Sequence, residues 1–356
     1  MFLCNAKVRI FHGRGKTHYR WLTCIFLAIK SSIFVNLQPI EIKNNMKLHE
    51  EINFARALLI LMVVLIHIVH FGELYPETKS IILSFMMPSF LLITGYLTNI
   101  EKTPCAFCGY LLRIAVPYVV MVSSFSLLSY YLPVRDRITE LSVSQFAERI
   151  FVSSIGPYWF FYVMLVCSVL FYISFNCIPF LGNNLFTRFS VFGFLLTVLS
   201  FVLPILSIQT VVYYFIGTIL RQTRCDYSAV FRPTPYAILP FIALIIFGRH
   251  RDWADIAVFA SVFCFLSFSS WCFCKLGTRA KSAFSNLGMN TLPIFLFHPI
   301  FTLSSKYYLR FFTWDSTGFA FIIITIFFSV LGSLLIARVL DATNLSYIFA
   351  RKKFLR

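Results

Sequence analysis

The chain has 356 residues, of which 59% are hydrophobic, 18% are aromatic and 13% are charged, and its mean hydropathy is +0.80. A soluble globular domain cannot bury that much apolar surface, so the composition excludes an ordinary soluble protein. The net charge of +17 is typical of nucleic-acid binding, but the basic residues gather mainly in alternate loops and at the two chain ends, where membrane topology explains them. We therefore expect membrane lipids as neighbours and no nucleic acid as a partner.

The first 45 residues differ from the rest of the chain. They are rich in lysine and arginine and hold one short apolar run, WLTCIFLAI, which is too short to span a bilayer. Three interpretations stay open: an interfacial segment, a signal sequence that lacks a small-residue cleavage site, and an upstream extension with translation starting at Met46. We favour the third. The expected organisation is thus a basic extension over 1–45, a membrane domain over 46–345 and a basic cytoplasmic tail over 346–356.

Apolar segments recur from Asn53 onward, many of them with roughly the 17 to 25 residues that a bilayer requires. They predict an all-α, polytopic integral membrane protein with about ten transmembrane helices. The expected helices lie near residues 53–72, 80–98, 110–132, 156–178, 189–206, 208–221, 235–248, 254–274, 288–306 and 318–340.

Basic residues are distributed unevenly over the loops between these segments. With ten spans, one side of the membrane carries Lys47, Lys102, Arg188, Arg221, Arg224, Arg232, Lys275, Arg279, Lys281 and the basic residues of the tail. An excess of lysine and arginine marks the cytoplasmic side. We therefore expect a multi-pass protein of the cell inner membrane with both termini in the cytoplasm.

The first apolar segment, NFARALLILMVVLIHIVHFG, carries two ionisable residues, Arg56 and His67. Eleven helical steps of roughly 100° bring the two back to within about 20° of the same direction. Such residues usually face a protein interior or a water-filled cavity, because exposing them to lipid is costly. Snorkelling of Arg56 to the headgroups and an interior hydrogen bond for His67 are the alternatives, but the shared face favours a polar path through the helix bundle.

A second histidine, His298, lies in the segment LGMNTLPIFLFHPI at a depth similar to that of His67. Pro299 follows it, so we expect a kink or break there and a free backbone carbonyl beside the imidazole. A packing histidine is the alternative interpretation.

Histidine has an unperturbed pKa near neutrality and suits the removal of a proton from an alcohol that attacks an acyl group. That reaction also requires donors for the oxyanion and cations for an anionic acyl carrier. The candidates are His67 as the base, Tyr96, Tyr158 or Trp159 as donors, and Arg56 and Arg113 as cations. The first segment has no carboxylate that could orient His67, and the ten cysteines lack a paired metal-ligand pattern, so we expect no metal.

At these residues the sequence resembles acyltransferase family 3, the integral-membrane enzymes that O-acylate bacterial surface sugars. The hallmark of that family is an arginine, ten residues and a histidine in the first helix, which Arg56 and His67 match. The segment MMPSFLLITGYL is similar to the family's second-helix motif, with Thr94 in place of the usual serine.

Three later segments resemble family motifs in the same order: LLRIAVPY, which holds Arg113, then GPYWFFYVML, which holds Trp159, and LGMNTLPIFLFHP, which ends with His298 and Pro299. The sequence also departs from the family pattern. Asn53 stands where an aspartate is usual, and Arg113 is the only basic residue of a frequent pair.

The resemblance implies that acyl-CoA, usually acetyl-CoA, is used from the cytoplasmic side as a donor substrate, with no bound cofactor. It implies a polysaccharide hydroxyl, or that of a lipid-linked sugar precursor, as the acceptor. Arg56 and Arg113 would then contact the carrier, and His67 would act on the hydroxyl or relay the acyl group.

Three alternatives stay open. A transporter or flippase for an envelope precursor would also line an inner face with polar residues. The segment HRDWAD places His250 and Asp255 in a spacing found in glycerolipid acyltransferases, although the expected topology puts it outside. A scaffold subunit of an envelope pathway would have the same fold without turnover.

Overall fold

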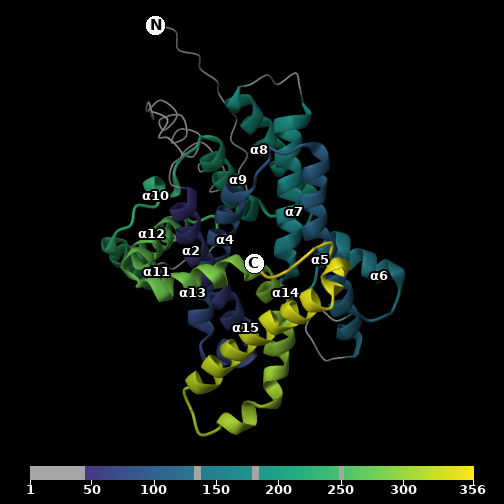
Figure 1. Cartoon of the computed structure of the whole chain (residues 1–356), viewed down its shortest axis with the longest axis vertical. Helices are drawn as coiled ribbons and strands as arrows, with labels where there is room; N and C mark the ends of the chain where they lie inside the picture. Colours follow the sequence, from purple (N-terminus) through teal and green to yellow (C-terminus); the bar gives the residue numbers. More distant parts are fainter. Residues whose placement is uncertain (1–44, 132–137, 179–183, 248–251) are drawn as a thin grey trace, which may run out of the picture. The chain divides into compact units, whose positions relative to one another are not determined.

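The fold is helical throughout the residues that our computed structural model describes, which are 45–131, 138–178, 184–247 and 252–356. Residues 46–356 form one compact unit. The elements are α2 (Asn45–Ile66), α3 (Val69–Leu74), α4 (Pro76–Leu97), α5 (Pro104–Tyr131), α6 (Val143–Glu148), η1 (Arg149–Ser153), η2 (Gly156–Tyr158), α7 (Trp159–Tyr172), η3 (Ile173–Cys177), α8 (Leu185–Val202), α9 (Ile208–Gln222), α10 (Tyr227–Val230), η5 (Pro235–Ala237), α11 (Ile238–Phe247), α12 (Ile256–Lys275), α13 (Thr278–Met289), α14 (Thr291–Ser304), η6 (Ser305–Tyr307), η7 (Leu309–Phe312), α15 (Phe319–Ala342) and η8 (Leu345–Phe349) (Figure 1).

The structure does not confirm the number of membrane spans that the sequence predicted. Within the described ranges six helical segments are long and apolar enough to cross a bilayer: α4, α5, Gly156–Cys177, α8, α12 and α15. The bent pair of α13 and α14 would make a seventh, so the expected ten are not confirmed. Three predicted spans do form helices, but α9 has 15 residues, α11 has 10, and the first half of α2 carries charged residues.

Among the described elements, α4 and α9 share the most extensive contact, and two glycines bring their backbones together. A Cβ on Gly95 would lie 2.2 Å from the carbonyl oxygen of Tyr214, and one on Gly217 would lie 2.1 Å from that of Leu92. Small residues allow such close approach between helices in membranes. The glycine of the ITGYL segment is therefore a packing residue.

The chain bends by 75° between α13 and α14, at Asn290. The Asn290 side-chain amide donates to the carbonyl of Asn286 at 2.8 Å, and Pro293 has no amide proton for the next helical bond. Both effects end the helical ladder of α13. The amphipathic helix α13 itself was not among the predicted elements.

The helices differ in how much of their surface the protein covers. Most of α4 is buried, whereas α8 exposes large apolar side chains such as Phe194 and Phe201. Water would disfavour such a surface, but the hydrocarbon of a bilayer matches it. The core that positions the site is thus built around α4, with α8 at the lipid side.

Candidate functional site

His67 marks the end of α2. The sequence predicted one continuous helix over 53–72, but α2 ends at Ile66 and α3 begins at Val69. The His67 ring donates from Nδ1 to the carbonyl of Val63 at 2.7 Å, while its backbone amide bonds to Val64 instead, at 3.2 Å. The side chain thus takes the carbonyl that the next helical bond would have used, which explains the break.

His298 is fully buried in α14. Its Nδ1 lies 3.0 Å from the carbonyl oxygens of both Ile294 and Phe295. In an unbroken helix the amide of residue 299 would bond to the Phe295 carbonyl, but Pro299 has no amide proton. The carbonyl that proline leaves free lies beside the imidazole, as the sequence predicted, and accepts from it. The expected break is not present, because α14 continues through Pro299 to Ser304.

The two histidine rings contact each other edge to face, with centroids 5.0 Å apart and planes at 68°. A carbonyl oxygen only accepts, so each Nδ1 must carry the proton and each neutral ring presents a bare Nε2. The Nε2 of His298 is buried and has no hydrogen-bond partner among the described residues. Backbone carbonyls thus orient both rings, which is the role that a carboxylate often has.

Arg56 contacts α14 as well. Its Nη2 donates to Thr291 Oγ1 at 2.7 Å, and its Nη1 donates to Asn53 Oδ1 at 3.3 Å. Arg56 and His67 therefore both face α14. Arg56 contacts Thr291, the first residue of that helix, and His67 contacts the buried His298. The amide oxygen of Asn53 thus accepts the second hydrogen bond that Arg56 donates.

Close packing of α13 against α2 supports this arrangement. A Cβ on Gly288 would lie 1.9 Å from the carbonyl oxygen of Asn53, so only glycine fits there. Asn290 exchanges hydrogen bonds with the backbone of Arg356, at 2.9 Å and 3.4 Å. The residues after α15 thereby fix the bend from which α14 starts.

Arg113 is an exposed residue of α5. Its carbonyl accepts from Nη1 of Arg351 at 2.8 Å, and Pro117, four residues on, leaves that carbonyl without a helical donor. Burial of the Arg351 guanidinium, followed by the nearby charges of Arg356 and Arg113, lowers the pKa of Arg351 to about 10. Arg351 was not among the predicted site residues, and only the freed carbonyl could have indicated a partner for it.

Two of the three predicted oxyanion donors, Tyr158 and Tyr96, donate to backbone carbonyls. Tyr158 is buried and donates to Leu296 at 2.9 Å, and Tyr96 donates to Cys225 at 3.1 Å. Trp159 packs against Trp253, with centroids 6.1 Å apart. Tyr158 therefore lies beside the α14 segment that carries His298, while Tyr96 and Trp159 contact other elements.

Sequence reasoning missed Thr291 and the carbonyls that orient the two rings. His250 of the HRDWAD segment lies outside the described residues. Among the residues that the structure does describe, no group of three or more histidine, cysteine or acidic side chains is arranged to hold a metal ion.

The fold and the site define an integral-membrane protein in which two helices distant in sequence bring together a pair of oriented imidazoles, with an arginine between the same two helices. A family model described as an acyltransferase domain matches residues 49–338, which is most of the chain. The chain therefore belongs to acyltransferase family 3, as the sequence motifs predicted. Comparisons with curated proteins and with solved structures found no match.

Proposed function

We propose that this chain is an O-acyltransferase of the cell inner membrane that moves an acetyl or similar acyl group from acyl-CoA to a hydroxyl of a cell-surface polysaccharide or of its lipid-linked precursor. Membership of the acyltransferase family supports the reaction type. The observation that carries the proposal is the His67–His298 pair, in which both Nε2 atoms are left as proton acceptors.

His67 is the proposed base because it is the less buried ring of the pair. Its Nε2 takes the proton of the sugar hydroxyl as the oxygen attacks the thioester carbonyl. The tetrahedral intermediate then collapses, the carbon–sulfur bond breaks, and the thiolate of CoA leaves and receives the proton. His298 packs edge on against His67 and limits the orientations open to the reacting ring.

Arg56 is proposed to act on the anionic carrier. Only two of its five donors are used within the described residues, by Thr291 and Asn53. The remaining donors form a planar fork suited to a phosphate or carboxylate oxygen. Arg113, an exposed cation, is a second candidate for the carrier in the same proposal.

The test is complementation of a deletion strain with the wild type, His67→Ala or His70→Ala at matched membrane abundance, followed by mass spectrometry of base-labile O-acyl groups on the surface polysaccharide. His70→Ala is the control because His70 contacts Phe321 and Glu73 rather than His298. We expect the wild type and His70→Ala to restore acylation and His67→Ala to fail. Acylation that is unchanged by the deletion would favour transport, which releases no CoA.

A further inference from the structure

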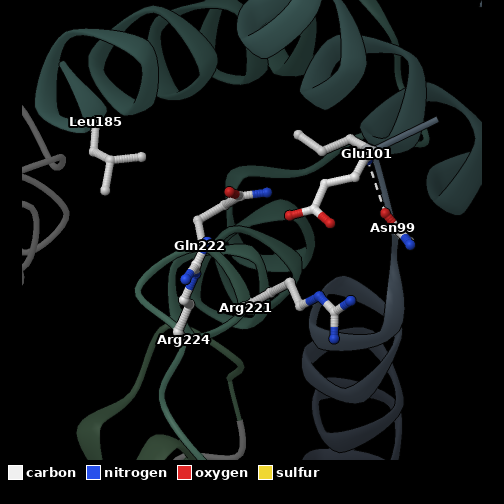
Figure 2. A pocket seen from close by; sticks show the side chains of 7 residues that line it. Asn99, Glu101, Leu185, Arg221, Gln222 and Arg224 are labelled. Atoms are coloured by element: carbon white, nitrogen blue, oxygen red, sulfur yellow. Dashed lines mark hydrogen bonds between the residues drawn. The ribbon is translucent and has the colours of Figure 1, made fainter. Parts of the chain in front are cut away.

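A second polar site lies where the loop after α4, the start of α8 and the end of α9 meet. A cavity of about 250 Å³ opens there, lined by Asn99, Ile100, Glu101, Leu185, Arg221, Gln222 and Arg224. Figure 2 shows the side chains of Glu101, Gln222 and Arg221 around one space, with Arg224 next to Gln222. None of the residues with a proposed role in the reaction lines this cavity.

Arg224 holds an unusual backbone conformation for its residue type. The amide of Cys225 bonds to Leu220 and that of Arg224 bonds to Arg221, which is the Schellman pattern at the end of α9. The residue after the C-cap in this pattern is left-handed and is most often glycine. Arg224 occupies it with φ = 53°, at a cost of roughly 1–2 kcal/mol relative to glycine. Glycine at position 224 would make the fold more stable, so the Arg224 side chain has a role other than stabilising the fold.

The charges at this site are available to a ligand. Within the described part of the chain, neither the Arg221 nor the Arg224 guanidinium has an ion pair or a side-chain hydrogen bond. Two guanidiniums that line one cavity favour an anion, and their planar donors match phosphate oxygens. Glu101 and Gln222 add an acceptor and an amide, which suit hydroxyl or amino groups of the same ligand.

Two simpler explanations exist for basic residues at this place. Cations near a helix C-terminus interact favourably with its dipole, and cytoplasmic loops are rich in arginine. A basic residue at another position in the last turn of α9 would satisfy the first explanation, and one elsewhere in the same connection, such as the exposed Arg232, would satisfy the second. Neither requires arginine at the one position that favours glycine.

We propose that this cavity binds the 3′-phosphorylated ribose of a CoA-type acyl donor, an inference that rests on the proposed function. Two guanidiniums match the nearly double charge of a phosphate monoester better than the single charge of a lipid phosphodiester. The volume fits a phosphorylated sugar rather than a whole nucleotide. Arg221 and Arg224 also belong to the basic residues that the sequence prediction places on the cytoplasmic side, where acyl-CoA is found.

The experiment uses the full chain in phosphatidylcholine nanodiscs and compares the Kd of CoA with that of dephospho-CoA, which lacks only the 3′-phosphate. The wild type should bind CoA about tenfold more tightly or better, since a charge-assisted hydrogen bond is worth about 1.5–3 kcal/mol. Arg221→Gln and Arg224→Gly should lose this preference while their affinity for dephospho-CoA stays unchanged. Arg232→Gln, which removes the same charge from an exposed neighbour, should behave as the wild type.

Arg224→Gly also separates binding from folding. Glycine suits the left-handed position, so its melting temperature should equal or exceed that of the wild type. A variant that is at least as stable yet loses the preference for CoA would support the site. A preference that survives in both Arg221→Gln and Arg224→Gly would overturn it.

Two further arms separate the possible sources of phosphate and the two proposals. The first arm measures the phosphatidylglycerol bound to the wild type and to both cavity variants in nanodiscs that contain this lipid. If both variants selectively lose the lipid and the wild type shows no preference for CoA, the cavity binds a lipid headgroup and the CoA proposal is overturned. His67→Ala should keep both affinities. If the wild type binds CoA with the expected preference but transfers no acyl group, the cavity site is supported and the proposed function is ruled out. If the wild type does not bind CoA, both proposals are overturned.

Discussion

Two helices, α14 and α5, contain the same interruption and use it differently. Pro299 frees the carbonyl of Phe295, and the preceding residue of the same helix, His298, donates to it. Pro117 frees the carbonyl of Arg113, and Arg351, 238 positions away, donates to it. In a bilayer a free carbonyl must be satisfied. A local imidazole partner orients a reactive group, and a distant guanidinium partner fastens one segment to another.

The largest expected effect concerns the ring in α14. His298→Asn retains a donor that reaches the same carbonyls but removes the ring that packs against His67, so we expect acyl transfer to fall by roughly 10²-fold with folding intact. Initial rates with acyl-CoA and thermal melting of purified protein would measure both. Full activity in this variant would show that His298 does not position His67, and His70→Ala serves as the control that should change little.

The proline beside it should have a smaller effect. Pro299→Ala supplies an amide that competes with His298 for the Phe295 carbonyl, while the Ile294 carbonyl still accepts. We expect activity to fall by about tenfold while the melting temperature rises or stays equal, because an interior proline costs a helix roughly 3 kcal/mol. A parallel loss of stability and activity would contradict the proposed orienting role of the free carbonyl.

In α5 the expected consequence is structural. Arg351→Gln shortens the side chain and leaves the Arg113 carbonyl without this donor, which should cost about 0.5–1.5 kcal/mol of unfolding free energy because water can reach this carbonyl. Denaturation in detergent would measure it, with Lys353→Gln as an exposed control of equal charge change. Equal stability of the two variants would show that the contact of Arg351 with α5 does not stabilise the fold.

The smallest expected effect is a coupling. In Pro117→Ala the helix satisfies the Arg113 carbonyl itself, so Arg351→Gln should then cost less than half of its effect in the wild type. A double-mutant cycle on the free energy of unfolding measures this difference. Additive effects would mean that the arginine acts through something other than the carbonyl that proline frees.

The sequence supplied the family, the helical class and the face shared by Arg56 and His67, because periodicity and motif spacing are local properties. It also located the free carbonyl at Pro299, since the missing proton of proline is a covalent fact. The sequence could not predict that α2 ends at His67, because this break forms when the His67 ring competes for a carbonyl of its own helix. Helix α13 was missed for a related reason: its path depends on how Gly288 packs against Asn53.

The pairing of α2 with α14 could not be read from either segment alone. Arg56 gives no sign that Thr291 is its partner, since 235 positions separate them and the hydrogen bond exists only after folding. The predicted number of spans is not confirmed, because apolar length was counted without the turns that shorten helices such as α9 and α11. Composition marks what can enter a bilayer, whereas helix ends depend on hydrogen bonds formed in the folded chain.

The separation of the two paired helices in sequence has a consequence for biosynthesis. Arg56 enters the membrane early, whereas Thr291 and His298 are synthesised only near the end of the domain. Until α14 is inserted, the arginine lacks its threonine partner and the two imidazoles cannot meet. A chain interrupted by premature termination before residue 291 would therefore hold an unpaired intramembrane cation and no reactive pair, which makes it a ready substrate for membrane quality-control proteolysis.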